Sequence, residues 1–184
     1  MELTASGKSL LGRTRGKWAY VSLAGAGRIF VPLPEPLQAI GAPEFSPDGR
    51  RLACRSPEAG AGEVYVVDFS EFTNLRQISR GGGFNPQWHP DSTELFFLSN
   101  DGRSLMAARP KPGGSEFEPP SRIFDLPASI SSGHPGWPSF YSVSPDGNCF
   151  LMVENVEDNS TAIAASKPNA MIVENWAEEF RETK

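Results

Sequence analysis

Few residues of this sequence have the types and spacing that chemistry requires, and Gly7-Lys8-Ser9 is the first candidate. A phosphate-binding loop needs a further glycine five residues before the Gly-Lys pair, because its backbone N–H groups cradle the phosphates. Glu2 occupies that position, so the sequence does not predict a phosphate loop. It also contains no G-x-S-x-G nucleophile elbow and no H-E-x-x-H zinc motif. We therefore predict no catalytic residues.

Three aspartates could suggest a carboxylate set for acid–base chemistry, but each lies in a turn motif. Asp48 and Asp146 follow Ser-Pro and precede Gly, whereas Asp91 lies in the related segment His-Pro-Asp-Ser. In such turns proline presets φ, the aspartate bonds nearby backbone and glycine takes a positive φ. We interpret all three as turn residues, with His89 capping its hairpin rather than acting in catalysis. Ser92, in the glycine position, is expected to bear a strain of about 1 kcal/mol.

The segment 131–140, SSGHPGWPSF, holds the candidate ligand-binding residues. It lies in an insertion between the third and fourth copies of an internal repeat of the sequence. Such insertions tend to gather on the binding face of repeat proteins. His134, Trp137 and Phe140 are predicted to contact a peptide or small molecule there. In the alternative interpretation, Trp137 only fills the groove between two sheets, as aromatic residues commonly do.

The two cysteines, Cys54 and Cys149, stand 95 positions apart, and the sequence has only two histidines. Because there is no Cys-x-x-Cys pair, the sequence predicts no metal site. The thiols are expected to be free and buried or half-buried on strands. No cofactor is expected either.

Composition excludes several classes of partner. The 184 residues include 17 basic and 22 acidic side chains, which gives a net charge of −5 and argues against nucleic acids or anionic membranes as partners. No apolar run is long enough for a membrane helix, and the first residues lack the apolar stretch of a secretory signal. We therefore expect a cytoplasmic chain.

The turn motifs recur and reveal an internal repeat. Their equivalent positions are Ser6, Asp48, Asp91 and Asp146. The spacings are 42, 43 and 55, and the last interval contains the insertion, placed near 126–140. A period of about 40–45 residues is typical of a propeller blade of four strands. The 18 glycines and 17 prolines fit the many tight turns of such a fold.

The strand after each turn gives an independent test of this interpretation. The fourth residue after the turn position is Leu10, Leu52, Leu95 or Phe150, and the fifth is Leu11, Ala53, Phe96 or Leu151. Successive strand residues point to opposite faces, so both faces of each strand are apolar. Such a strand must be covered on both sides, as it is between neighbouring blades.

These observations predict an all-β fold, a β-propeller of about four blades of four antiparallel strands, with a short C-terminal helix. We expect one domain over 1–184. The predicted blades cover about 3–36, 42–80, 84–126 and 139–176, and the helical tail covers 177–184.

The repeat resembles a known family. FSPDGRRLACRS, followed by GEVYVVDF and LRQIS, is similar to the TolB-like, WD-repeat-like β-propellers of bacteria. The order of the later segments, closing with Asn175-Trp176 and an acidic tail, resembles the C-terminal blades of propellers fused to bacterial serine/threonine kinases. Those relatives carry further N-terminal blades and often a membrane segment, and their propellers can be extracytoplasmic. This chain has no kinase signature, so the resemblance implies a scaffold role rather than kinase activity.

Two classes of function remain open at this point. The first is a non-enzymatic binding or scaffold module for proteins or small ligands, since propellers present loops around a channel. The second is a hydrolase or lyase acting at the channel mouth, or the propeller part of a peptidase. A cluster of carboxylates or histidines with strongly shifted pKa values would favour the second.

Self-association is also predicted, because blade four has only three predicted strands and an unpaired edge attracts a partner. We expect a homodimer in which two open half-propellers complete one another. The alternatives are that the tail and the stretch 154–169 cover this edge, that another protein binds there, or that the chain forms a small, closed ring of four blades.

Overall fold

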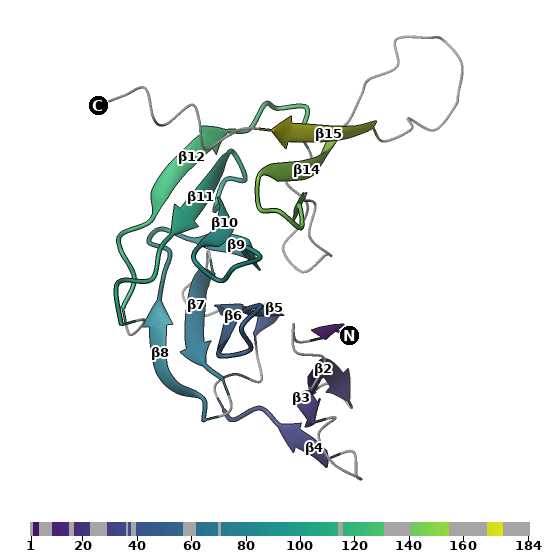
Figure 1. Ribbon diagram of the computed structural model, residues 1–184, viewed down its shortest axis with the longest axis vertical. Helices are drawn as coiled ribbons and strands as arrows, with labels where there is room; N and C mark the ends of the chain where they lie inside the picture. Colours follow the sequence, from purple (N-terminus) through teal and green to yellow (C-terminus); the bar gives the residue numbers. More distant parts are fainter. Residues whose placement is uncertain are drawn as a thin grey trace.

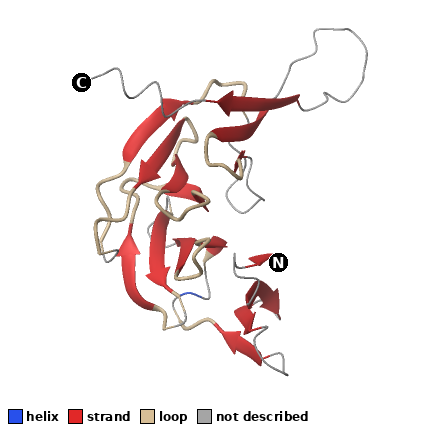
Figure 2. Cartoon of the chain, viewed as in Figure 1, coloured by secondary structure: helices blue, strands red, loops and turns tan. Residues whose placement is uncertain are grey.

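The computed structural model shows a chain built almost entirely of strands and loops (Figure 2). The residues that it describes are 2–3, 9–14, 17–22, 29–35, 37, 40–56, 62–69, 71–113, 116–130, 141–154 and 169–174. The predicted all-β fold is therefore confirmed. The expected helix over 177–184 lies outside the described residues.

The strands form four antiparallel sheets that follow one another along the chain, with the strands of each sheet in sequence order. The first sheet contains β1 (Glu2–Leu3), β2 (Ser9–Thr14), β3 (Lys17–Ser22) and β4 (Ile29–Pro32). The second contains β5 (Gly41–Phe45), β6 (Arg51–Ser56), β7 (Glu63–Asp68) and β8 (Thr73–Gln77). The third contains β9 (Gly83–Trp88), β10 (Leu95–Ser99), β11 (Ser104–Ala108) and β12 (Ser121–Asp125). Within the described residues, the fourth has three strands: β13 (Tyr141–Val143), β14 (Cys149–Glu154) and β15 (Asn169–Glu174).

The four sheets lie along an open arc, with the first and fourth sheets at its two ends (Figure 1). Strands β5 and β9 lie on the inside of the arc, and β8 and β12 lie on the outside. The first strands of neighbouring sheets contact one another, β1 with β5, β5 with β9 and β9 with β13. Each sheet is therefore one unit of a radial array, built around its own turn motif.

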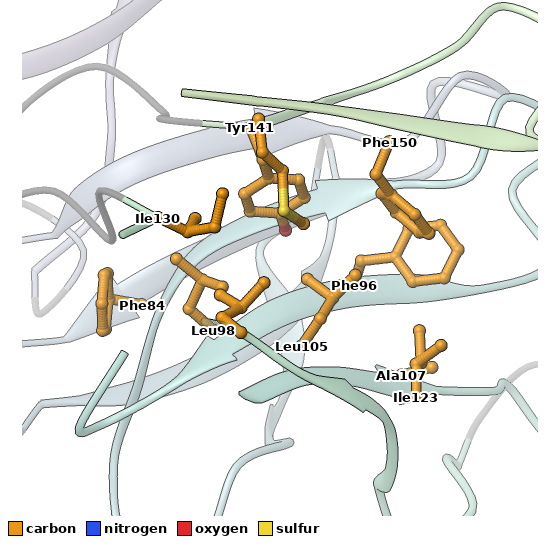
Figure 3. Packing of buried hydrophobic residues seen from close by; sticks show 11 residues of the cluster. Phe84, Phe96, Leu98, Leu105, Ala107, Ile123, Ile130, Tyr141 and Phe150 are labelled. Atoms are coloured by element: carbon orange, nitrogen blue, oxygen red, sulfur yellow. The ribbon is translucent and has the colours of Figure 1, made fainter. Parts of the chain in front are cut away.

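Among the described residues, the core consists of three apolar clusters, one between each pair of neighbouring sheets. Leu52 of β6 packs toward the first sheet, whereas the next residue, Ala53, packs toward the third. Likewise Leu95 of β10 packs toward the second sheet and Phe96 toward the fourth. Figure 3 shows the cluster between the third and fourth sheets, where Phe96 meets Phe150. The prediction that both faces of the strand after the turn are covered is confirmed for β6 and β10, whereas Leu151 of β14 is 45% exposed.

The two thiols also behave as expected. Cys54 is buried in the cluster between the first and second sheets, Cys149 is half-buried, and both are free. Burial raises the pKa of the Cys54 thiol to about 12, because the charged thiolate would lose its hydration. Cys54 is therefore a packing residue.

The turn motifs have the predicted geometry. Gly49 and Gly147 take φ values of +70° and +75°, and Ser92 takes +66° in the same position. The expected left-handed backbone at Ser92 is thus confirmed. The Ser92 hydroxyl also accepts a hydrogen bond from the backbone N–H of Asp48, at 3.0 Å. This bond joins the turns of the second and third sheets and helps to offset the local strain.

Polar side chains link neighbouring sheets along the inside of the arc. Glu44 of β5 accepts a hydrogen bond from the N–H of Trp88, at 3.0 Å. Gln87 of β9 makes the equivalent link to the fourth sheet: its amide donates to the Tyr141 carbonyl at 2.7 Å and accepts from the Val143 N–H at 3.3 Å. Glu44 and Gln87 both stand four residues before the turn aspartate of their own sheet. The repeat therefore places a bridging side chain at the same sequence position in both interfaces.

We expect Gln87→Ala to lower the free energy of unfolding by about 1–3 kcal/mol, because it leaves two backbone groups of β13 without their partner. Chemical denaturation measures this change. Gln77→Ala is the control: this exposed glutamine of β8 donates one hydrogen bond, to the Ser79 carbonyl of its own sheet, and its loss should cost less than that of Gln87. Equal effects of the two substitutions would contradict the bridging role.

Candidate functional site

The predicted ligand-binding residues His134, Trp137 and Phe140 lie outside the described residues. The structure does describe the start of the insertion. Leu126 and Ile130 are buried in the cluster between the third and fourth sheets, and the Leu126 N–H donates to the Arg103 carbonyl at 2.7 Å. The first part of the insertion thus packs into the core between these sheets.

A groove of about 410 Å³ lies between the third and fourth sheets, and we call it the 3–4 groove. It is formed by the β9–β10 turn, the end of β11, the start of β12 and the β13–β14 turn. Ala107 and Ile123 belong both to its lining and to the apolar cluster, where they lie at the opposite end from Phe84 and Ile130 (Figure 3). The groove therefore has an apolar floor and a rim of turn residues.

An ion pair with very unequal exposure lines the groove. Glu94, directly before β10, is only 7% exposed, and its Oε1 accepts a hydrogen bond from the Nε of Arg109. The second carboxylate oxygen, Oε2, is buried and has no hydrogen-bond partner among the described residues. The side chain of Arg109 is 62% exposed. The groove thus has an exposed guanidinium in its lining and an unsatisfied, buried acceptor next to it.

The carbonyl of Glu94 is itself held by the hairpin, since it accepts a hydrogen bond from the His89 N–H at 2.9 Å. The His89 ring contacts Asp91 through Nδ1, with 2.5 Å to Oδ1, as Ser46 and Ser144 contact the aspartates of their own turns. This is the hairpin-capping role predicted for His89. The groove is therefore built on a hydrogen-bonded turn.

The turn aspartates near the groove have lowered pKa values. Hydrogen bonds from the Ser144 hydroxyl and the Asn148 backbone lower the pKa of Asp146 to about 2. Partial burial acts to raise the pKa of Asp91, but hydrogen bonds from Thr93 and His89 outweigh it, and the pKa is lowered. Both carboxylates are therefore ionised at neutral pH and act as acceptors in their turns.

Because these pKa values are lower in the folded than in the unfolded chain, the aspartates stabilise the fold above their unfolded pKa. That contribution disappears as the pH falls, and for Asp146 the window runs from about 4 to about 2. We expect the urea midpoint to fall over this range, and to fall less steeply in Asp146→Asn. Identical slopes in the two proteins would contradict the assignment.

Sequence reasoning missed Glu94 and Arg109 as site residues. A signal was present: Glu94 directly precedes the apolar strand LFFLS, and Arg109 directly follows the strand SLMAA. Charged residues at the ends of fully covered strands must either reach the surface or pair. Among the described residues, no group of His, Cys, Asp or Glu is placed to hold a metal ion. The arrangement is suited to binding a small polar ligand by hydrogen bonds and charge.

Comparison with known proteins finds no matching family model and no matching curated protein. Among solved structures, TolB from Acinetobacter baumannii superimposes with a TM-score of 0.56 at 19% sequence identity, over 94% of this chain and 40% of that one. The chain has a TolB-like β-propeller fold. The tricorn protease gives a TM-score of 0.56 at 11% identity, over 91% of this propeller and 15% of that chain.

An auxiliary nutrient binding protein from Bacteroides thetaiotaomicron VPI-5482 gives a TM-score of 0.50 at 13% identity, over 94% of this propeller and 41% of that chain. The propeller thus spans less than half the length of each of these three structures. At such identities the likeness establishes the fold alone. No helix among the described parts of the propeller is long and apolar enough to cross a membrane.

Proposed function

We propose that this propeller is a non-enzymatic binding module and that the 3–4 groove is its ligand site. The observation that carries the proposal is the buried, unpartnered Oε2 of Glu94, a residue that lines the groove. An unsatisfied buried polar group costs about 1–3 kcal/mol, more when charged, and native proteins contain few of them. A ligand donor at this oxygen would remove that cost. A nutrient binding protein of similar fold supports a binding role.

The experiment is a fragment screen followed by protein NMR. We expect bound fragments to shift the amide signals of Glu94, Arg109 and Asn148, which lie around the groove. Ser121→Trp fills the groove from its exposed rim and should abolish these shifts. Thr73→Trp, at an exposed position of β8, is the matched control and should leave them unchanged. Shifts confined to other surfaces would overturn the proposal, and conversion of a fragment into product would favour the hydrolase or lyase alternative.

We also propose that the module self-associates through the two ends of the arc. The fifth residue after the turn position packs toward the next sheet: Leu11, Ala53 and Phe96 are almost fully buried there. Leu151, the equivalent residue of the fourth sheet, is 45% exposed.

The first sheet offers the matching surface. The fourth residue after the turn position packs toward the preceding sheet, and at this position Leu52, Leu95 and Phe150 are fully buried. Leu10 holds this position in the first sheet and is only half-buried. At each interface between neighbouring sheets, the face with the fifth residue of one sheet packs on the face with the fourth residue of the next. The exposed face around Leu151 is therefore expected to pack on the first sheet of a second copy.

Light scattering tests this association. We expect the wild-type chain to show twice the monomer mass of 20.0 kDa, and Leu151→Asp to be monomeric. Leu75→Asp is the matched control, since Leu75 is 48% exposed but lies on β8, away from both end faces. A monomeric wild-type chain that still unfolds cooperatively would overturn the proposal, as would equal loss of association in both variants.

A further inference from the structure

The charges of the 3–4 groove restrict the ligand it can take. Glu94 and Arg109 carry opposite charges in direct contact. Two further charged residues line the groove and have partners of their own: Arg122 is paired with Asp125 at 2.8 Å, and Asp91 is bound by His89 and Thr93. An ion with a single charge gains attraction from one member of the Glu94–Arg109 pair and suffers repulsion from the other. A ligand with two opposite charges can match both members at once.

The unused hydrogen-bonding groups of Glu94 and Arg109 also require a ligand with both a donor and an acceptor. Glu94 Oε2 is an acceptor that needs a donor. Arg109 uses its Nε toward Glu94, and its two terminal amines have no hydrogen-bond partner among the described residues. An ammonium group supplies up to three donors, and a carboxylate accepts two hydrogen bonds from a guanidinium. Oε2 is buried, so the ammonium reaches it by displacing a side chain, and exposed Arg109 has the freedom to move.

The size and floor of the groove complete the description. A volume of about 410 Å³ lies within the usual range for small-molecule sites. Ala107 and Ile123 supply apolar contact below the charged pair. A ligand that fits therefore has an ammonium group, a carboxylate and an aliphatic portion.

We propose that the 3–4 groove binds a small zwitterion, namely an aliphatic α-amino acid or a short peptide that ends in one. Its ammonium group binds Glu94, its carboxylate binds Arg109, and its side chain rests on Ala107 and Ile123. This assignment rests on the proposed binding function and names its ligand class. In either ligand one small molecule carries both the ammonium group and the carboxylate, so it can bind Glu94 and Arg109 together once Arg109 has moved aside.

Calorimetric titration with four compounds tests the assignment: leucine, leucinamide, N-acetyl-leucine and leucyl-leucine. Leucinamide lacks the carboxylate and N-acetyl-leucine lacks the ammonium group, so each should bind at least about tenfold more weakly than leucine. Leucyl-leucine distinguishes the two sources, because tighter binding than leucine indicates a peptide and weaker binding a free amino acid. Equal binding of leucine and either blocked compound would overturn the zwitterion assignment.

Substitutions at Arg109 and Glu94 test which residue binds each charged group of the ligand. Arg109→Gln should weaken the binding of leucine by about tenfold or more without weakening that of leucinamide, which loses a repulsive charge. Glu94→Gln should likewise weaken the binding of leucine without weakening that of N-acetyl-leucine. Arg103→Gln, at an exposed arginine beyond the β10–β11 turn, is the control and should bind leucine normally. Because Glu94 is buried, thermal unfolding must show that Glu94→Gln is folded, and Arg109→Lys provides a second test at the exposed partner.

Failure of the zwitterion assignment can be distinguished from failure of the proposed binding function. If fragments bind in the groove but leucine does not, the zwitterion assignment is wrong and the proposed binding function stands. If neither binds there, both are wrong.

Discussion

Phe96→Ala is expected to lower the free energy of unfolding by about 3–5 kcal/mol, the usual cost of removing a fully buried aromatic side chain. Phe96 is 0% exposed, and its ring meets that of Phe150 edge to face, with 4.9 Å between centroids. Truncation therefore removes apolar burial, the ring contact and packing between the third and fourth sheets together. Urea denaturation followed by intrinsic fluorescence measures the change.

The loss should be local as well as large. In a repeat fold each unit contacts only its neighbours, so stability is distributed over the interfaces between units. Hydrogen exchange should therefore speed up first at the β14 amides, such as those of Phe150 and Met152, before it does at β6. Leu75→Ala, at an exposed leucine, is the control and should change stability by less than about 0.5 kcal/mol. A change below about 1 kcal/mol for Phe96→Ala would contradict the packing described.

The core of this fold was accessible from the sequence because turn chemistry and strand periodicity are local. Once Asp48, Asp91 and Asp146 are aligned, counting forward assigns Leu52, Leu95 and Phe150 to one face and the next residue to the other. No structure is needed for this step, since side-chain direction alternates along any strand. The left-handed residue at Ser92 followed from the same alignment.

The 3–4 groove could not be predicted from the local sequence, because its charged side chains come from different strands. Glu94 and Arg109 are 15 residues apart, and they meet only because β10 and β11 pair in a particular register. That register depends on turn length and on packing, neither of which the local pattern of charge reveals. The insertion with His134, Trp137 and Phe140 is visible in the sequence because it breaks the repeat, whereas the groove lies within regular repeat positions.

Gly147 illustrates a second contact that local pattern does not reveal. A Cβ added at Gly147 would lie 1.9 Å from His89 Nε2, so the turns of the third and fourth sheets touch at this point. The φ of Gly147 is +75°, which already disfavours any other residue. We expect Gly147→Ala to lower the free energy of unfolding by about 2–4 kcal/mol, since the clash adds to a backbone cost of about 1–2 kcal/mol. Urea denaturation again measures the change.

Two further variants separate these causes. Gly81 has a φ of +86° but open space around it, so Gly81→Ala should show only the backbone cost of about 1–2 kcal/mol. His89→Ser restores the residue that Ser46 and Ser144 supply in the equivalent turns and keeps a hydroxyl for Asp91. In that background Gly147→Ala should cost no more than Gly81→Ala, because the clashing ring is gone. If the cost of Gly147→Ala were the same with histidine or serine at position 89, the two turns would not be coupled through this contact.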